Sequence, residues 1–277
     1  MTAPPSSGLR FSPASALVSK ALEAVRAGPR TPEELARDVL GISGATGELA
    51  RRVTAEVLEG HDDVTFRDGR WRTTGRRDPG EASLGELDYV VVDVETTGVA
   101  PSRGHRVTEI AAVQVTRGRV AGEFSTLVNP ERPIPARIRE LTGITDEMVA
   151  DAPTFGDVSD VVRDELEERV FVAHNVPFDW RFLAAEMRRS RSLTPEGPRL
   201  CTLRLARRAL PELPRKGLDA VARHYDVEID GRHRALGDAL ATATVLLRLL
   251  EEADRRGVDR WGALRRWLGG APAPDEG

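Results

Sequence analysis

The first part of the chain carries apolar and polar residues in patterns typical of helices and then of a hairpin. Apolar residues between positions 17 and 25 repeat at helical spacing, and TPEEL at 31–35 predicts a capped helix start. A third helix is expected over 47–59, with three apolar residues on one face: Leu49, Val53 and Val57. The next stretch, DVTFRDGRWRTT, predicts a hairpin that turns at Asp68-Gly69. Three helices and a hairpin predict a small winged-helix-like α+β domain over residues 16–75.

The two faces of that predicted hairpin differ in chemistry. A turn at Asp68-Gly69 pairs Phe66 with Trp71 on one face. The other face then carries polar and basic residues: Thr65, Arg67, Arg70 and Arg72. A basic face of this kind suits nucleic-acid phosphates, and it is equally typical of a solvated hairpin on a protein-interaction module. Both interpretations stay open.

Further along, the pattern changes to alternating strands and helices. YVVVDVE predicts a buried strand, RVTEIAAVQVTRGRVAGEFSTLVNP an antiparallel pair, and RVFVAHN a strand before a helix at PFDWRFLAAEMRRS. Helices are also expected near 217–225, 236–254 and 258–268. This order predicts an α/β domain over 87–255, in which helices flank a mixed sheet. The remaining segments are expected to be a disordered tail at 1–15, a linker at 76–86, and a C-terminal helix and tail at 256–277.

Composition narrows the class of protein. The chain of 277 residues has no apolar run of bilayer-crossing length, and its N-terminus lacks the pattern of a secretion signal. Cys201 is the only cysteine, which excludes an intramolecular disulfide and a thiolate zinc cluster. We therefore expect a cytoplasmic protein with no membrane partner. The net charge of −4 does not exclude a nucleic-acid partner, because acids at a metal site can coexist with a basic groove.

The stretch YVVVDVETTG places two acids in a strand that is expected to be buried. Side chains alternate along a strand, so Asp93 and Glu95 project from the same face and repel each other. An arginine from elsewhere, a shared proton or a divalent cation would each make this pair tolerable. Mg²⁺ prefers carboxylate oxygens and often binds through one or two carboxylates together with substrate phosphate. The pair alone is also compatible with an acidic strand end in solvent.

Two further stretches place acids and a histidine at helix starts. HNVPFD puts Asp179 in the first turn of a helix, and HRALGDALAT puts His233 before a helix and Asp238 near its beginning. Each of these residues alone is compatible with an ordinary helix-start acid or a structural histidine. Their combination with Asp93 and Glu95 favours a metal site.

Taken together, the motifs DVETTG, HNVPFD and HRALGDALAT resemble those of the DEDDh, or DnaQ-like, 3′→5′ exonucleases. That family includes the proofreading ε subunit of bacterial DNA polymerase III. The resemblance covers residues 86–255, includes LTGIT at 141–145, and leaves the N-terminal 85 residues outside. It implies a ribonuclease H-like fold and His233 as the general base. It also implies two Mg²⁺ or Mn²⁺ ions held by four acids: Asp93, Glu95, Asp179 and Asp238.

The same resemblance implies a set of residues that bind the substrate: Thr96, Thr97, Leu141, Ile144 and Asn175. The threonines would meet the terminal nucleotide through backbone groups, and the two aliphatic residues would pack against its base or sugar. For all four, a role in core packing stays open. Asn175 would fix the loop or a phosphate.

The expected function is hydrolysis of phosphodiester bonds at the 3′ end of single-stranded DNA, with release of nucleoside monophosphates, in proofreading or repair. Two alternatives stay open. One is an exoribonuclease of the same family that trims RNA. The other is a non-catalytic nucleic-acid-binding regulator, although such a regulator has no physical reason to keep four acids around a histidine. Association with a DNA polymerase also stays open, because no sliding-clamp motif beginning with glutamine follows residue 255.

Overall fold

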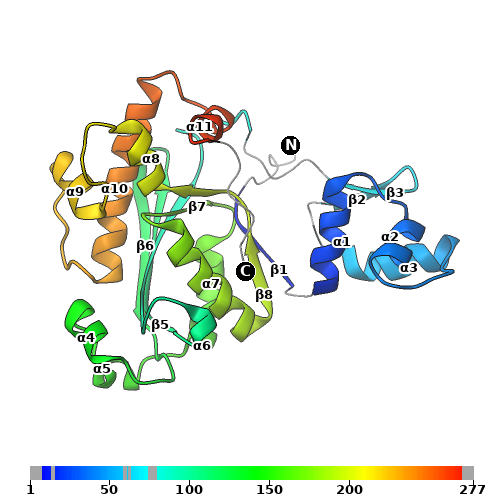
Figure 1. The fold of residues 1–277 in the computed structure, drawn as a ribbon, viewed down its shortest axis with the longest axis horizontal. Helices are drawn as coiled ribbons and strands as arrows, with labels where there is room; N and C mark the ends of the chain where they lie inside the picture. The colour runs from blue at the N-terminus through cyan, green and yellow to red at the C-terminus, as the bar shows by residue number, and fades with distance from the viewer. Residues whose placement is uncertain (1–7, 14–15, 59–60, 62–63, 74–79, 270–277) are drawn as a thin grey trace.

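A five-stranded mixed sheet forms the centre of the α/β part of the molecule (Figure 1). The computed structural model describes residues 8–13, 16–58, 61, 64–73 and 80–269. The strands lie in the order β6 (Arg119–Leu127), β5 (Val107–Thr116), β4 (Tyr89–Thr96), β7 (Val170–Ala173) and β9 (Arg199–Cys201). β4 pairs antiparallel with β5 and parallel with β7, while β5 and β6 are antiparallel and β7 and β9 are parallel. The predicted mixed sheet is confirmed.

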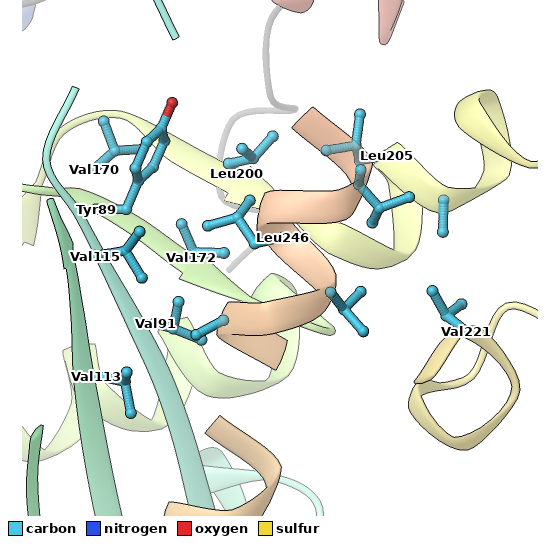
Figure 2. Close-up of a cluster of buried hydrophobic side chains, with 14 of the residues drawn as sticks. Tyr89, Val91, Val113, Val115, Val170, Val172, Leu200, Leu205, Val221 and Leu246 are labelled. Carbon is cyan, nitrogen blue, oxygen red and sulfur yellow. The ribbon is translucent and has the colours of Figure 1, made fainter. Parts of the chain in front are cut away.

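Alternating side chains along β4 divide the apolar interior into two clusters, one on each face of the sheet. Tyr89 and Val91 belong to the cluster covered by α8 (Thr202–Ala209), α9 (Leu218–His224), α10 (Ala235–Asp254) and α11 (Trp261–Trp267). Val90 and Val92 belong to the other cluster, with α6 (Phe155–Leu166) and α7 (Val176–Arg191). Figure 2 shows the first cluster, in which Leu246 of α10 faces the sheet. Helices on both faces match the expected ribonuclease H-like arrangement.

Three short helices lie outside these two layers. They are the 3₁₀ helix η1 (Pro101–Arg103), α4 (Ala136–Thr142) and α5 (Asp146–Ala150). The segment around α4 and α5 has a small core of its own, formed by Ile134, Ile144 and Val149. Within the described residues, no helix has both the length and the apolar composition that a bilayer crossing requires.

The N-terminal module has the predicted order of elements. It comprises α1 (Ala16–Ala27), α2 (Pro32–Asp38), α3 (Gly47–Leu58), β2 (Val64–Arg67) and β3 (Arg70–Thr73). Thr31 and Glu34 form the expected capping box, and Phe66 pairs with Trp71 across the hairpin, with ring centroids 5.4 Å apart. The predicted inner face of α3 is wrong at Leu49, which is exposed, because α3 turns Ala50, Thr54 and Leu58 inward instead. The winged-helix-like character of the module stays a prediction.

The expected disorder of residues 1–15 is wrong for residues 8–13. β1 (Arg10–Pro13) pairs antiparallel with β8 (Leu193–Glu196), a strand that the sequence pattern also did not indicate. Leu9 is fully buried, and its N–H donates to the Arg169 carbonyl at 2.7 Å. Residues 1–15 are rich in Pro, Ser and Ala, which suggested disorder. Residues 10–13 form a strand because they pair with the backbone of a distant segment, β8. Residues 1–7 and 14–15 lie outside the described part of the chain.

The expected linker at 76–86 and the expected C-terminal helix are both joined to the α/β domain where they are described. Leu84 is buried in the same cluster as Trp261 of α11, and its N–H donates to the Asp259 carbonyl at 2.8 Å. The hydroxyl of Tyr89 in turn donates to the Leu84 carbonyl at 2.7 Å. Residues 80–86 and α11 are therefore part of the domain rather than extensions from it. Residues 74–79 and 270–277 lie outside the described chain.

Candidate active site and metal centre

The two acids of β4 lie on the face of the sheet that α10 covers. Asp93 and Glu95 follow Tyr89 and Val91 at a spacing of two residues, and both are half-buried. Asp93 lies opposite Ala111 on β5, where a small side chain leaves room, and Glu95 lies opposite Glu109. Strand periodicity therefore places both carboxylates on one face of the strand, as the sequence predicts, and that face is the one that α10 covers.

Asp238 and His233 approach the same place from the start of α10. Asp238 lies in the first turn of the helix and is buried, while His233 belongs to the loop before it. Ligand atoms of Glu95, His233 and Asp238 all lie within 4.8 Å of one another. The backbone N–H of His233 donates to Asp238 Oδ2 at 3.3 Å. The helix start and its loop thus form one unit with the end of β4.

A glycine allows that loop to lie directly on the helix. A Cβ at Gly237 would stand 1.7 Å from the carbonyl oxygen of Asp230, so no other residue fits there without displacing the loop. His233 itself has a left-handed backbone with a φ of 62°, a conformation that costs energy for a residue with a side chain. The close contact at Gly237 and the turn at His233 together aim the imidazole toward Glu95 and Asp238.

Asp179 reaches the site from the opposite layer. It lies in the first turn of α7 and is buried; burial raises the pKa of its carboxyl, and the nearby backbone groups of Asp179 itself and of Val94 oppose that rise. Val94 stands between Asp93 and Glu95 on β4, so the Asp179 carboxyl lies at the acidic end of that strand. The structure therefore gathers all four predicted acids and the histidine from β4, α7 and α10.

The buried surroundings of the four acids disfavour their charged forms. Burial, together with the Asp238 carboxylate, raises the pKa of Asp93 to about 8. Burial, together with Asp93, raises the pKa of Glu95 to about 9 and also raises the pKa of Asp179. Burial raises the pKa of Asp238 as well, although Arg232 opposes that rise. Buried carboxylates of this kind ionise readily only when a cation lies beside them.

The donor set fits a hard divalent cation. Four carboxylates and one imidazole offer oxygen and nitrogen ligands without sulfur, which suits Mg²⁺ or Mn²⁺ better than a soft metal. Asp238 Oδ1 is buried and has no hydrogen-bond partner among the described residues. A buried, unpartnered carboxylate oxygen is costly unless something binds it. Asp93, Glu95, Asp179 and Asp238 could therefore hold such ions.

Arg232 is a component of the site that the sequence interpretation missed. Its Nη1 donates to Asp238 Oδ2 and its Nε donates to Asp219 Oδ1 at 2.7 Å. The arginine thus offsets part of the negative charge of the Asp238 carboxylate. The available signal was its position immediately before His233, and Asp219 on α9 gave no local signal.

Glu109 is a second missed residue. It is a buried acid of β5 whose carboxylate accepts hydrogen bonds from the Arg234 side chain and from the backbone N–H of Ala235. These contacts fix the residue that follows His233 and the first residue of α10. The signal in the sequence was an acid within the apolar strand RVTEIAAV.

The predicted substrate residues divide into buried and exposed groups. Thr96 and Thr97 are buried, and the Thr97 N–H donates to the Arg106 carbonyl at 2.8 Å, so that group already has a partner. Ile144 is fully buried in the core around α4 and α5, which favours its packing role. Leu141 of α4 is 53% exposed, and Asn175 is exposed at the start of α7. Direct contact with a nucleotide therefore stays a prediction, with Leu141 and Asn175 in the more accessible positions.

His174 is a half-buried histidine beside the site with a structural set of contacts. Its Nε2 lies 3.0 Å from the Lys216 carbonyl and its Nδ1 lies 2.9 Å from Thr202 Oγ1. A carbonyl can only accept, so Nε2 carries the proton and Nδ1 accepts from the threonine hydroxyl. Burial lowers the pKa of His174 to about 4. The neutral ring joins the end of β7 to the segment before α9.

A ribonuclease H-like sheet on which acids converge from β4, α7 and α10 is the architecture of the DEDDh nucleases. The sequence profile of the RNase_T family, described as exonuclease, matches residues 90–246. The chain belongs to this exonuclease family. The matched region lies entirely within the α/β domain and does not include the N-terminal module.

Several known proteins are similar to this chain. A DNA polymerase III subunit epsilon-like protein of Rhodobacter capsulatus is 42% identical over 191 residues, which are 66% of this chain and 27% of that protein. The DNA polymerase III subunit epsilon of Aquifex aeolicus is 36% identical over 179 residues, which are 64% of this chain and 88% of that protein. A structure of exonuclease X in complex with 5′ overhanging duplex DNA matches with a TM-score of 0.51 and 29% identity, over 65% of this chain and 99% of that chain. The chain spans less than a third of the length of the first curated relatives it matches.

Proposed function

We propose that the protein is a metal-dependent 3′→5′ exonuclease that hydrolyses phosphodiester bonds at the 3′ end of single-stranded DNA and releases nucleoside monophosphates, in proofreading or repair. The observation that carries this proposal is the convergence of buried acids from three elements beside His233. Burial makes their charges unfavourable, as the raised pKa values of Asp93 and Glu95 indicate. A fold gains nothing from such a cluster unless cations bind there.

The four acids have the role of metal ligands in this proposal. Asp93, Glu95, Asp179 and Asp238 hold two divalent cations, Mg²⁺ or Mn²⁺. Such ions, when bound, supply positive charge to the attacking and leaving oxygens of a phosphodiester and make a bound water more acidic. The unpartnered Oδ1 of Asp238 supports this role, because it is a carboxylate oxygen that lacks a protein donor.

His233 has the role of general base. Its side chain is half-buried and lies on a loop, within 4.8 Å of ligand atoms of Glu95 and Asp238. An imidazole in this position can accept a proton from a water that attacks the phosphorus, because general bases act at hydrogen-bond distance from the proton they take. Glu109 and Gly237 keep the loop in place, so they support the geometry without touching the reacting atoms.

DNA with a free 3′ end is the favoured substrate. The exonuclease X structure is of a complex with DNA, and the similar proteins of R. capsulatus and A. aeolicus carry the name of a DNA polymerase III subunit. The exposed Leu141 on α4 is a suitable surface for a terminal base or sugar. Association with a DNA polymerase belongs to the same proposal.

A digestion series with one preparation tests the proposal. Single-stranded DNA labelled at its 5′ end is incubated with Mg²⁺ or Mn²⁺, with and without chelator, beside the same sequence as RNA and as a mismatched duplex. We expect a metal-dependent ladder that shortens from the 3′ end, with mononucleotide products, and no ladder for Asp93→Asn. Shortening of the RNA alone would favour the exoribonuclease. Binding without metal-dependent shortening of any substrate would favour the non-catalytic regulator.

A further inference from the structure

Arg232 holds two acids at once, one inside the site and one outside it. Nη1 of its guanidinium donates to Asp238 Oδ2, while Nε and Nη2 donate to the two oxygens of Asp219 at 2.7 Å and 3.4 Å. Asp238 is buried, whereas the Asp219 side chain is 59% exposed on α9. The arginine therefore stands between a buried acid that needs a cation and a solvated acid that does not.

The surroundings of Arg232 leave space for this side chain to move. Arg232 and Asp219 line a cavity of about 440 Å³ between α9 and the loop that leads to α10. Asp219 also lines a neighbouring cavity of about 690 Å³, together with Leu213 and Pro214. The Arg232 side chain is 33% exposed. A guanidinium that leaves Asp238 can thus remain bound to Asp219 without crossing the protein interior.

A divalent cation and the arginine compete for the same carboxylate. A cation bound by Asp238 and Glu95 would lie close to the guanidinium, and two like charges in a partly buried site repel strongly. The position of Asp238 is also kept by the His233 N–H and by the first turn of α10, so the carboxylate does not depend on the arginine for its orientation. The arginine is then dispensable for the geometry of Asp238 but not for its charge.

We propose that Arg232 is a displaceable counter-cation, which neutralises Asp238 in the metal-free protein and is retained by Asp219 alone when a divalent cation binds. The pair Arg232–Asp219 then sets the affinity of the site for that cation. This inference rests on the proposed function, because it concerns the same carboxylates. It adds a pair of residues that sets the cation affinity of the site, and Nη1 of Arg232 also lies 3.3 Å from Nδ1 of His233.

Calorimetric titration of Mn²⁺ into the full chain measures this effect without any need for activity. Arg232→Gln should bind Mn²⁺ about tenfold more tightly, because the substitution removes a like charge beside the bound cation, and its melting temperature in chelator should fall. Asp219→Asn should bind Mn²⁺ about tenfold more weakly, because the arginine loses its second partner. Arg232→Lys should restore an affinity near that of the wild type, since it keeps the charge.

The double variant makes the test specific. If Asp219 acts through Arg232, Asp219→Asn should have little further effect in the Arg232→Gln background. Weaker or unchanged Mn²⁺ binding by Arg232→Gln would overturn the inference, because the arginine would then be orienting Asp238 rather than competing for it. If Arg232→Gln does not fold, unchanged Mn²⁺ affinity in Asp219→Asn overturns the inference on its own. Absence of Mn²⁺ binding by the wild type would instead overturn the proposed function.

Discussion

Glu109 of β5 and Arg234 form a fork of hydrogen bonds beside the acidic site. Glu109 lies opposite Glu95 in the sheet, and Arg234 follows His233 in the sequence. Arg234 Nη2 donates to Glu109 Oε1 at 2.8 Å, and Arg234 Nε donates to Oε2 at 3.1 Å. Oε2 also accepts from the Ala235 N–H at 2.9 Å. One buried carboxylate thus fixes the residue after His233 and the first residue of α10, and it offers negative charge to the start of that helix.

Glu109→Gln should slow cleavage through the position of His233. The substitution keeps the size of the side chain but removes the charge that holds Arg234 and the helix start, so we expect a loss of about 2 kcal/mol in the free energy of unfolding. We also expect kcat on a DNA oligonucleotide to fall about tenfold or more, because small displacements of catalytic groups are costly. Chemical denaturation and steady-state kinetics measure the two effects.

The same helix provides the control for Glu109. Glu251 lies on α10 and pairs with Arg248 at 3.4 Å, and both side chains are more than half exposed. Glu251→Gln should change stability by less than about 0.5 kcal/mol and leave kcat unchanged. Equal kcat values for the two variants would show that Glu109 does not position His233 for cleavage.

Asp93→Asn should stabilise the metal-free protein and abolish its response to metal. The folded protein raises the pKa of Asp93 from 3.8 to about 8. Protonation of this group therefore stabilises the fold fully at low pH, and that stability is lost as the pH rises through about 8. In chelator, the melting temperature of the variant should increasingly exceed that of the wild type over this range. With Mn²⁺, only the wild type should gain stability.

An exposed acid serves as the reference for that experiment. Asp164→Asn on α6 removes a charge that pairs with Arg163 at the surface, where the side chain is 67% exposed. Its melting temperature should follow that of the wild type at every pH and with every metal concentration. If Mn²⁺ raised the melting temperature of Asp93→Asn as much as that of the wild type, Asp93 would not be a metal ligand.

Local patterns predicted the features that depend on neighbouring residues. The period of two placed Asp93 and Glu95 on one face, the TPEEL motif gave the Thr31 cap, and Asp68-Gly69 gave the hairpin turn. Each depends on contacts within a few residues, where backbone geometry and side-chain chemistry act together. The same patterns predicted a mixed sheet flanked by helices.

Contacts between distant segments were not predictable from such patterns. Phe11 of β1 lies opposite Pro195 of β8, and nothing in the composition of either segment indicates a strand partner. The link from Arg232 to Asp219 depends on where α9 lies against the start of α10. In both cases tertiary packing decides which of many available polar partners meet, and spacing along the chain carries no information on it.

His174→Gln should make the free energy of unfolding less dependent on pH between about 4 and 6.5. The folded protein lowers the pKa of His174 from 6.5 to about 4, so the neutral ring contributes stability above 6.5 that is lost as the pH falls through about 4. The difference in unfolding free energy between wild type and variant should therefore shrink on acidification over that interval. His224→Gln, at an exposed position, should show no such trend. A pH-independent difference for His174→Gln would contradict the assignment of the neutral ring.

Leu9→Ala should destabilise the α/β domain although the residue precedes the N-terminal module. Leu9 is fully buried among apolar residues of the cluster that includes Phe171 and Leu166. Truncation of a fully buried leucine costs about 3 kcal/mol. Val99→Ala, at a position 62% exposed, should cost less than about 0.5 kcal/mol. Denaturation of the two variants in chelator compares them, and equal stability would mean that residues 8–13 are dispensable for the domain.

Leu141→Ala should weaken substrate binding without affecting stability. Leu141 is 53% exposed on α4, whereas Ile144, three residues later, is fully buried. Loss of an exposed leucine costs the fold little. It removes apolar area that a terminal base or sugar would cover, which weakens binding by about 1 to 2 kcal/mol. A loss of this size corresponds to a rise in KM of roughly tenfold. Val161→Ala on α6, 47% exposed, is the matched control and should leave KM unchanged. Steady-state kinetics on a single-stranded oligonucleotide measure both variants, and equal KM values would exclude Leu141 from the substrate surface.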